Sequence, residues 1–191
     1  MRLFDSLKDP RGFFESVKEE DWKPAFVFLL GVAIFLAIFT PIVNFLGIES
    51  TDSSSAFQAQ ILAYRFMQEY LLAPFGIFAY IIEAFLIIAF TIIILLVFTV
   101  FIHILYRLLG GKGSILNAWK AVCYGVGPCV FGGFLPLISL FAAFYSFLFQ
   151  LYIGPMVLYE VKESRAIIIL AIFIALTFIE MFVVGTTVGF L

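Results

Sequence analysis

Long apolar runs, broken only by short polar segments, constrain this chain more than any other feature of its sequence. Five such runs stand at residues 25–46, 77–109, 117–135, 137–160 and 166–191. A helix of about 20 apolar residues crosses the hydrocarbon core of a bilayer. Of the 191 residues, 64% are hydrophobic and 13% are charged, and a soluble domain of this size cannot bury so much apolar surface. The sequence therefore predicts an all-α, polytopic membrane helix bundle of five transmembrane helices, forming one membrane domain over residues 1–191.

Amphipathic helices are expected on both sides of the first run. In residues 1–24, Asp9 and Pro10 are typical of a helix start. Apolar side chains then follow at helical spacing: Phe13, Phe14 and Val17. We expect this helix to lie on the membrane surface with Trp22 as an interfacial anchor, although a docking helix for a partner has the same pattern. A second interfacial helix is expected in the outer loop, residues 48–76.

The basic residues indicate how the chain is oriented. Ten of the 11 lysine and arginine residues fall in the segments on one side of a five-span arrangement, and only Arg65 falls on the other. Because basic residues concentrate on the cytoplasmic side of a membrane, this bias predicts a multi-pass integral membrane protein with its N-terminus in the cytoplasm and its C-terminus outside.

Several functional classes are disfavoured by what the sequence contains. The net charge of −2 suggests no nucleic acid partner. The two cysteines, Cys123 and Cys129, fall on different faces of a helix, and the sole histidine, His103, has no nearby carboxylate or cysteine pair, so no metal site or cofactor is expected. The GGKGS segment lacks the spacing of a phosphate-binding loop. An enzyme is not expected.

Two carboxylates within the apolar runs are the candidates for an intramembrane polar or ion site. Glu83 and Glu180 are placed at similar depths from the outer end of their spans by helical rise. Three further polar residues accompany them: Asn44, Thr177 and Thr187. Carboxylates are costly in lipid and should face the bundle interior. They either hold helices together through hydrogen bonds or handle protons or cations.

A stripe of small and polar residues follows one face of the fourth run. Its members are Ser139, Ser146, Gln150 and Gly154. Such stripes usually mark close helix packing in a bilayer, and lining of a water-filled path is the alternative.

The third run is irregular where a helix should be most regular. Pro128 cannot donate a hydrogen bond to the carbonyl of Tyr124, and Gly125 and Gly127 stand between them. The sequence therefore predicts a kink over 124–128. The kink shapes the bundle, or it offers a freed carbonyl to an ion or to a polar side chain such as Gln150.

Four short segments together resemble the Yip family of membrane proteins. They are Asp9–Phe14 (DPRGFF), Tyr70–Phe75 (YLLAPF, with Pro74), the glycine-rich turn of Gly110, Gly111, Lys112 and Gly113, and Tyr124–Pro128 (YGVGP, with Tyr124, Gly125, Gly127 and Pro128). The resemblance covers nearly the whole chain. It implies five membrane spans with a cytosolic N-terminus.

The resemblance also implies limits on function. Eukaryotic members of the family act in vesicle traffic and organelle membrane shape through Rab GTPases and Yif-type partners. Their long cytosolic N-terminal region has no counterpart here, and Ala73 replaces the glycine of the motif at Pro74. Binding of a Rab-type GTPase is therefore not carried over. The chain looks like a prokaryotic member, which would lie in the plasma membrane.

These features favour a non-enzymatic membrane protein that organises membranes or binds partner proteins as a scaffold. Its expected partners are membrane lipid and other membrane proteins, including a second copy of itself. The alternative is a small proton or cation transporter or channel that uses the intramembrane glutamates, and a membrane-embedded enzyme ranks last.

Overall fold

The computed structural model describes residues 2–45, 66, 69–70, 73–76, 78–134 and 138–188, without the side chains of residues 43–45, 133–134, 139–140 and 180–188. All regular structure in these residues is helical, which confirms the all-α class for the part described. In chain order the elements are α1 (Arg2–Lys8), α2 (Pro10–Ser16), α3 (Trp22–Phe45), the short 3₁₀ helix η2 (Ala73–Phe75), α5 (Phe78–Leu108), α6 (Ile115–Gly125), α7 (Cys129–Phe134), α8 (Ser139–Leu148), the π-helical segment η4 (Phe149–Ile153), α9 (Gly154–Tyr159) and α10 (Glu163–Val188).

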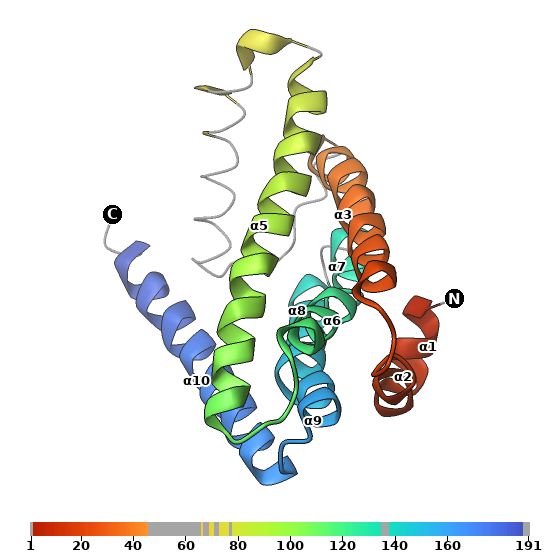
Figure 1. Cartoon of the computed structure of the whole chain (residues 1–191). Coiled ribbons are helices and arrows are strands. Elements are labelled where there is room, and N and C mark those ends of the chain that lie inside the picture. The colour runs from red at the N-terminus through yellow and green to blue at the C-terminus, as the bar shows by residue number, and fades with distance from the viewer. Residues whose placement is uncertain are drawn as a thin grey trace.

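Helix α5 is the longest of the described helices and packs against α3 and α6. Figure 1 shows α5 running through most of the height of the molecule, with α3 on one side and α10 on the other. The α6, α8 and α9 helices lie below α3, between α5 and the outermost helices α1 and α2, which stand beside the lower half of the bundle (Figure 1). Helix α10 lies close to α5 at its lower end and diverges from it toward the C-terminus (Figure 1).

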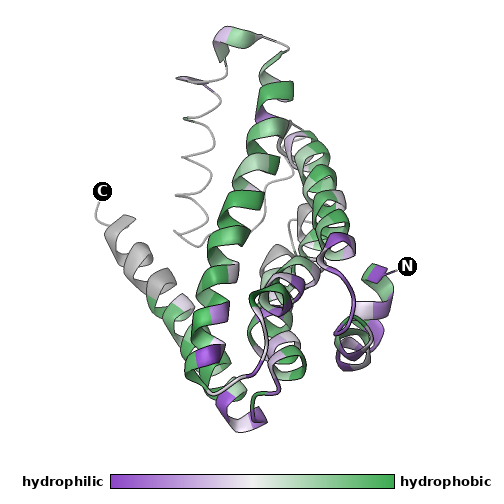
Figure 2. Ribbon diagram, in the orientation of Figure 1, coloured by the Kyte–Doolittle hydropathy of each residue, from purple (hydrophilic) through white to green (hydrophobic). Residues whose placement is uncertain are grey.

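Three helices among the described residues are long and apolar enough to cross a membrane. They cover Trp22–Ile42, Phe78–Leu108 and Phe141–Tyr159. The 31 residues of α5 would measure about 46 Å, longer than a hydrocarbon core, so this helix tilts or projects beyond it. Figure 2 shows the apolar residues spread over α3 and α5, while hydrophilic residues gather at the lower end and around α1 and α2.

The predicted third span is two short helices rather than one kinked helix. Helix α6 has 11 residues and α7 has 6, and neither is among the candidate spans. The interruption lies at Val126–Pro128, at the predicted position. Pro128 removes one helical hydrogen bond, and the Tyr124 carbonyl instead accepts the Gly127 N–H at 3.1 Å. The break is therefore a tight turn.

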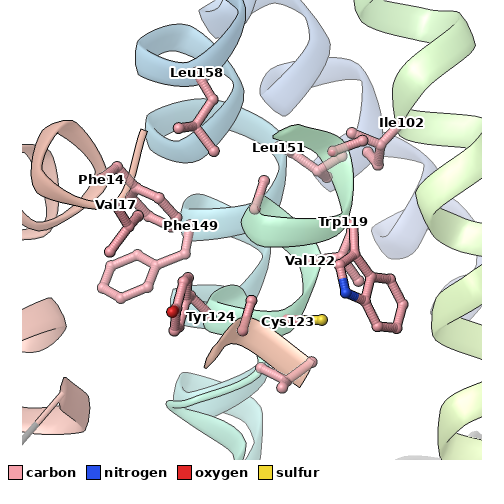
Figure 3. Packing of buried hydrophobic residues seen from close by; sticks show 14 of the residues in the cluster. Phe14, Val17, Ile102, Trp119, Val122, Cys123, Tyr124, Phe149, Leu151 and Leu158 are labelled. Atoms are coloured by element: carbon pink, nitrogen blue, oxygen red, sulfur yellow. The ribbon is translucent and has the colours of Figure 1, made fainter. Parts of the chain in front are cut away.

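The hydrophobic core is centred on α6. Its residues from 118 to 125 are all buried, and α3, α5 and α9 pack around it. Figure 3 shows Trp119, Val122, Cys123 and Tyr124 of α6 lying among side chains from other helices, including Phe149, Leu151 and Ile102. Because α6 is buried on every face over these residues, its glycine-ended break lies inside the bundle.

The fourth run forms α8, η4 and α9 as one helical path with a π-helical turn. The Gly154 N–H bonds the Phe149 carbonyl, five residues back. Pro155 follows directly and cannot donate, and a proline ring displaces the carbonyls of the preceding turn. The π turn therefore accommodates Pro155, and Gly154 lies on the side of the helix that faces α6.

The expectation that the first amphipathic helix lies on the membrane surface is wrong about its apolar face. Phe13, Phe14 and Val17 are 8%, 0% and 5% exposed, because α2 packs on α9 and η4. The start of α2 is as the sequence predicts, since Asp9 accepts the Gly12 N–H at 3.0 Å and Pro10 occupies the first turn. The apolar face covers protein rather than lipid. The expected helix in the outer loop lies outside the described residues, apart from 66, 69–70 and 73–76.

Candidate functional site

The N-terminal hairpin, residues 2–21, closes over the central helices and meets them at a polar junction. It consists of α1, α2 and the turn that leads into α3. Phe13 packs edge-on against Tyr124 with 5.0 Å between ring centroids, and Phe14 packs edge-on against Phe149 at 6.2 Å. The hairpin therefore seals the outer side of α6 and η4 with aromatic rings.

The hydroxyl of Tyr124 joins the hairpin to α6. Arg2 donates from both Nη atoms to the Glu20 carboxylate, at 2.8 and 2.5 Å. The Tyr124 hydroxyl donates to Glu20 Oε2 at 2.7 Å and accepts from Arg2 Nη1. A bidentate arginine–carboxylate pair fixes orientation as well as charge, so both ends of the hairpin meet at the tyrosine of the YGVGP segment.

The Glu20 carboxylate is held in its charged form. Hydrogen bonds from Arg2 lower the pKa of Glu20, against a smaller opposite effect of burial, and the Tyr124 hydrogen bond adds to the lowering. Glu160 behaves alike on the surface, where Lys18 donates to it at 2.5 Å and lowers its pKa. The hairpin is thus attached to α6 and to the end of α9 by carboxylates that stay ionised near neutral pH.

Lys120 is a buried cation that binds the backbone of the hairpin. Its side chain is 3% exposed, and Nζ donates to the carbonyls of Val17, Lys18 and Glu20 at 3.1, 2.5 and 2.9 Å. The carbonyls past the end of α2 accept no helical hydrogen bond. A lysine at this position supplies hydrogen-bond donors to them, and its positive charge interacts favourably with the negative end of the helix dipole. All three donors of the ammonium group are therefore used.

Sequence reasoning counted Lys120 only as a basic residue on one side and missed this role. The available signal is the spacing, because residues four apart share one face of a helix. Lys120 and Tyr124 have this spacing and lie on the face of α6 that meets the hairpin. A lysine inside an apolar run needs a set of acceptors, and the spacing indicates where to seek them.

The stripe of the fourth run packs against the broken end of α6. Ser146 donates to the Gly125 carbonyl at 2.6 Å, and Gln150 donates to the Ser146 hydroxyl at 2.9 Å. A Cβ on Gly125 would lie 2.2 Å from Gln150 Cγ, and one on Gly154 would lie 3.1 Å from Ala121 Cβ. These glycines permit close helix approach. The side chain of Ser139 lies outside the described residues.

The glycine-rich turn wraps the side chain of Tyr159. Gly110 has a φ of +84°, and with the Gly111 N–H bonded to the Tyr106 carbonyl at 2.9 Å it ends α5 in the Schellman geometry. A Cβ on Gly113 would lie 2.6 Å from the Tyr159 ring. The Lys112 N–H donates to the Tyr159 carbonyl at 2.9 Å, so the backbone of Lys112 takes part in the turn while its side chain is exposed.

Tyr159 also connects the turn to the sole histidine. Its hydroxyl donates to the Ser114 carbonyl at 2.7 Å and lies 2.7 Å from His103 Nδ1. A phenol has one proton to donate, so the histidine Nδ1 is the donor of the second bond. His103 therefore has a structural partner at this junction.

The predicted intramembrane site is only partly covered by the described side chains. Glu83 is fully buried on α5, and the Thr177 hydroxyl bonds the Phe173 carbonyl of its own helix at 3.0 Å. The side chains of Asn44, Glu180 and Thr187 lie outside the described residues. The association of Glu83 with Glu180 therefore stays a prediction.

The contact between α5 and α10 bears on that prediction. Phe98 and Phe173 meet with 6.4 Å between ring centroids. From this contact, Glu83 stands about four helical turns away along α5, and position 180 stands about two turns away along α10. The two positions thus differ by roughly 12 Å along the helix axes, which weighs against direct contact.

The remaining candidate positions lie apart from the hairpin junction. Pro74 lies in η2, whose residues are exposed, at the end of α5 remote from the glycine-rich turn (Figure 1). Cys123 is buried and Cys129 is partly buried, and both are free thiols. Within the described residues, no three His, Cys, Asp or Glu side chains are grouped so as to hold a metal ion.

The three long apolar helices define the class of this chain as a membrane protein, and all regular structure in its described residues is helical. The family model described as the Yip1 domain matches residues 4–184. The chain therefore belongs to the Yip1 domain family, as its motifs predicted. No curated protein and no solved structure matches it.

Proposed function

We propose that this protein is a non-enzymatic membrane scaffold that organises membranes or binds partner proteins through its spans and its hairpin end. One observation carries the proposal: the motif residue Tyr124 is engaged in holding the N-terminal hairpin onto the bundle. A binding protein requires a surface of fixed structure, and Tyr124 helps to fix the surface formed by the hairpin.

The hydrogen bonds of five other buried polar side chains support the proposal. Ser6, Thr99, Ser146 and Lys120 all donate to backbone carbonyls, and Gln150 donates to Ser146. Groups committed to internal hydrogen bonds stabilise helix packing, and they are not available to a substrate. The hairpin itself stays accessible, since Phe4 on α1 is 67% exposed.

The orientation belongs to the same proposal. Arg2, Lys18 and Lys120 make contacts of the hairpin, and Arg165 donates to the Leu109 carbonyl beyond the end of α5. The positive-inside tendency favours a cytoplasmic location for these residues. In this orientation the hairpin is accessible to cytoplasmic partners, and a second copy of the chain can be bound within the bilayer. A prokaryotic plasma membrane is the proposed location.

Site-specific photocrosslinking in native membranes tests the scaffold proposal. A photoreactive amino acid at Phe4 should give discrete protein adducts that are identified by mass spectrometry. The matched control position is Ile94 on α5, which is 60% exposed and should give mainly lipid adducts. If Phe4 yields no more protein adducts than Ile94, the hairpin is not a binding surface and the proposal fails.

A transporter remains the second candidate because of Glu83. The side chain is fully buried, and its neighbours on α5, Tyr80 and Ala84, line an apolar groove of about 450 Å³ against Pro41 of α3. Purified protein in liposomes should then conduct protons or cations, and replacement of both Glu83 and Glu180 by glutamine should abolish the flux. No flux, or flux unaffected by the two substitutions, excludes this function.

A further inference from the structure

A groove beside the first turn of α3 has the composition of a binding site for an anionic phospholipid. Its volume is about 580 Å³, and its lining comes from α1 and α3: Arg2, Leu3, Lys23, Pro24, Val27 and Phe28. Two cations and four apolar residues therefore share one hollow. The neighbouring groove between α1 and α2 differs, because Asp5, Asp9 and Glu20 contribute carboxylates to its lining.

Lys23 is the uncommitted charge of this groove. The residue is exposed, and the hydrogen bonds and ion pairs of the described residues leave its ammonium group unpartnered. Arg2 is engaged with Glu20 and Tyr124 through Nη1 and through one proton of Nη2. Its Nε–H and the second Nη2 proton remain available. Together the two residues can donate several hydrogen bonds to one phosphate group.

The groove lies where a phospholipid headgroup meets a spanning helix. Helix α3 is a candidate span from Trp22 onward, and its first turn carries the charge while its second turn is apolar (Figure 2). Trp22 is 40% exposed next to Lys23, and tryptophan is enriched at headgroup depth. Val27, 66% exposed, stands one turn further along the same side, at the start of the hydrocarbon region.

We infer that this groove binds one anionic glycerophospholipid, with its phosphate between Lys23 and Arg2 and an acyl chain along Val27 and Phe28. Because the charge of Arg2 is balanced by Glu20, the unpaired charge of Lys23 selects an anionic over a zwitterionic lipid, and the apolar wall selects a lipid over a free phosphate. The inference rests on membrane insertion and holds whether the protein acts as a scaffold or as a transporter.

Fluorescence quenching of Trp22 tests the inference on the full-length protein. The chain has two tryptophans, and Trp119→Phe leaves Trp22 as the single reporter beside the groove. Nanodiscs of phosphatidylcholine are doped with phosphatidylglycerol or phosphatidylcholine whose acyl chains are brominated near the glycerol. Brominated phosphatidylglycerol should reach half-quenching at a mole fraction about fivefold lower than brominated phosphatidylcholine, given the usual strength of a lysine near an anionic surface.

Three variants decide the source of any preference. Lys23→Gln should bring the two half-quenching fractions together, whereas Lys23→Arg should keep them apart because it keeps the charge. Lys162→Gln is the matched control, since Lys162 is an exposed lysine outside the groove, and it should leave the preference intact. Equal quenching by both lipids in the parent, or equal loss in Lys23→Gln and Lys162→Gln, overturns the site.

Discussion

A single phenol of the family motif holds both ends of the N-terminal hairpin. Tyr124→Phe removes the hydroxyl that bonds Arg2 and Glu20 and keeps the ring that packs on Phe13. Hydrogen bonds to charged groups contribute about 1.5–3 kcal/mol. We expect the free energy of unfolding in mixed micelles to fall by about 2 kcal/mol.

Tyr145→Phe is the control for that measurement. Tyr145 is 43% exposed and packs its ring on Phe149, and no hydrogen bond of its hydroxyl is described. Its substitution should change the free energy of unfolding by less than about 0.5 kcal/mol. Equal effects of the two substitutions would mean that the Tyr124 hydroxyl does not hold the hairpin.

The glycines of the motif differ in what they tolerate, and Gly113 is the sharpest case. A methyl group there would meet three ring carbons of Tyr159 at 2.6–2.8 Å, and the ring is held by its hydroxyl bonds to Ser114 and His103. Gly113→Ala should destabilise the protein by about 1–3 kcal/mol. The control is Gly31→Ala in α3, where nothing lies within 4 Å of the added carbon, and the expected change there is neutral or slightly stabilising.

The two substitutions are compared by equilibrium unfolding in the same mixed micelles. If Gly113→Ala is as stable as Gly31→Ala, the turn does not pack on Tyr159 as described. The glycines of the turn would then be required only for its backbone conformation.

At the scale of elements, the hairpin is attached by ionised carboxylates and should respond to acid. The pKa values of Glu20 and Glu160 are lowered by Arg2 and Lys18. A carboxyl group whose pKa is lower in the folded than in the unfolded state contributes its full stabilisation of the folded state above the ordinary pKa of 4.5. This contribution is lost as the pH falls through the lowered pKa. The hairpin should therefore stay docked near neutral pH and loosen below about pH 4.

A spin label at Phe4→Cys on α1 measures that loosening directly. Its mobility should be constant from neutral pH to about pH 5 and should rise below about pH 4. In a Glu20→Gln background the label should already be more mobile at neutral pH, and the acid transition should shrink. A label at Ile94→Cys on α5 is the control and should not respond. An acid transition unchanged by Glu20→Gln would show that this carboxylate is not the attachment.

The element boundaries show which features of the fold could be predicted from the sequence and which could not. Helix α5 agrees with its predicted run to within one residue at each end, because uniform apolar composition bounded by glycines leaves little choice. The proline and glycines at 124–128 located the break in the third run. They could not show that α6 would be buried on every side over 118–125, because burial depends on which helices surround it.

The position expected for the apolar face of α2, on lipid, was the larger error, and it has a physical cause. Phe13, Phe14 and Val17 form the same apolar stripe whether they face lipid or protein. Only the partners distinguish the two, and these are Tyr124, Phe149 and Lys120, more than a hundred residues further along the chain. Periodicity identified the helix and its start, while the contacts that assign its face are tertiary.

For the whole molecule, we expect the two ends of α5 to lie on opposite sides of the bilayer. Phe75 in η2 is 53% exposed and Lys112 follows the other end of the helix, which is long enough to cross the bilayer. A cysteine at Lys112 should react with an impermeant maleimide in inside-out vesicles only, and one at Phe75 in right-side-out vesicles only. Labelling of both from one side would contradict the topology.

The N-terminal hairpin is folded onto the α6 and α9 end of the bundle, and crosslinking of the ion pair between Lys18 and Glu160 measures this docking. Lys18 of the hairpin and Glu160 after α9 form an exposed ion pair at 2.5 Å. Zero-length carbodiimide coupling in native membranes should join the Lys18 ammonium group to the Glu160 carboxylate as an amide, detected as a linked peptide by mass spectrometry. Lys18→Arg should abolish this linked peptide, and Lys8, at the end of α1, should not form one with Glu160. Absence of the Lys18–Glu160 linkage, or an equal yield of a Lys8–Glu160 linkage, would contradict the docked hairpin.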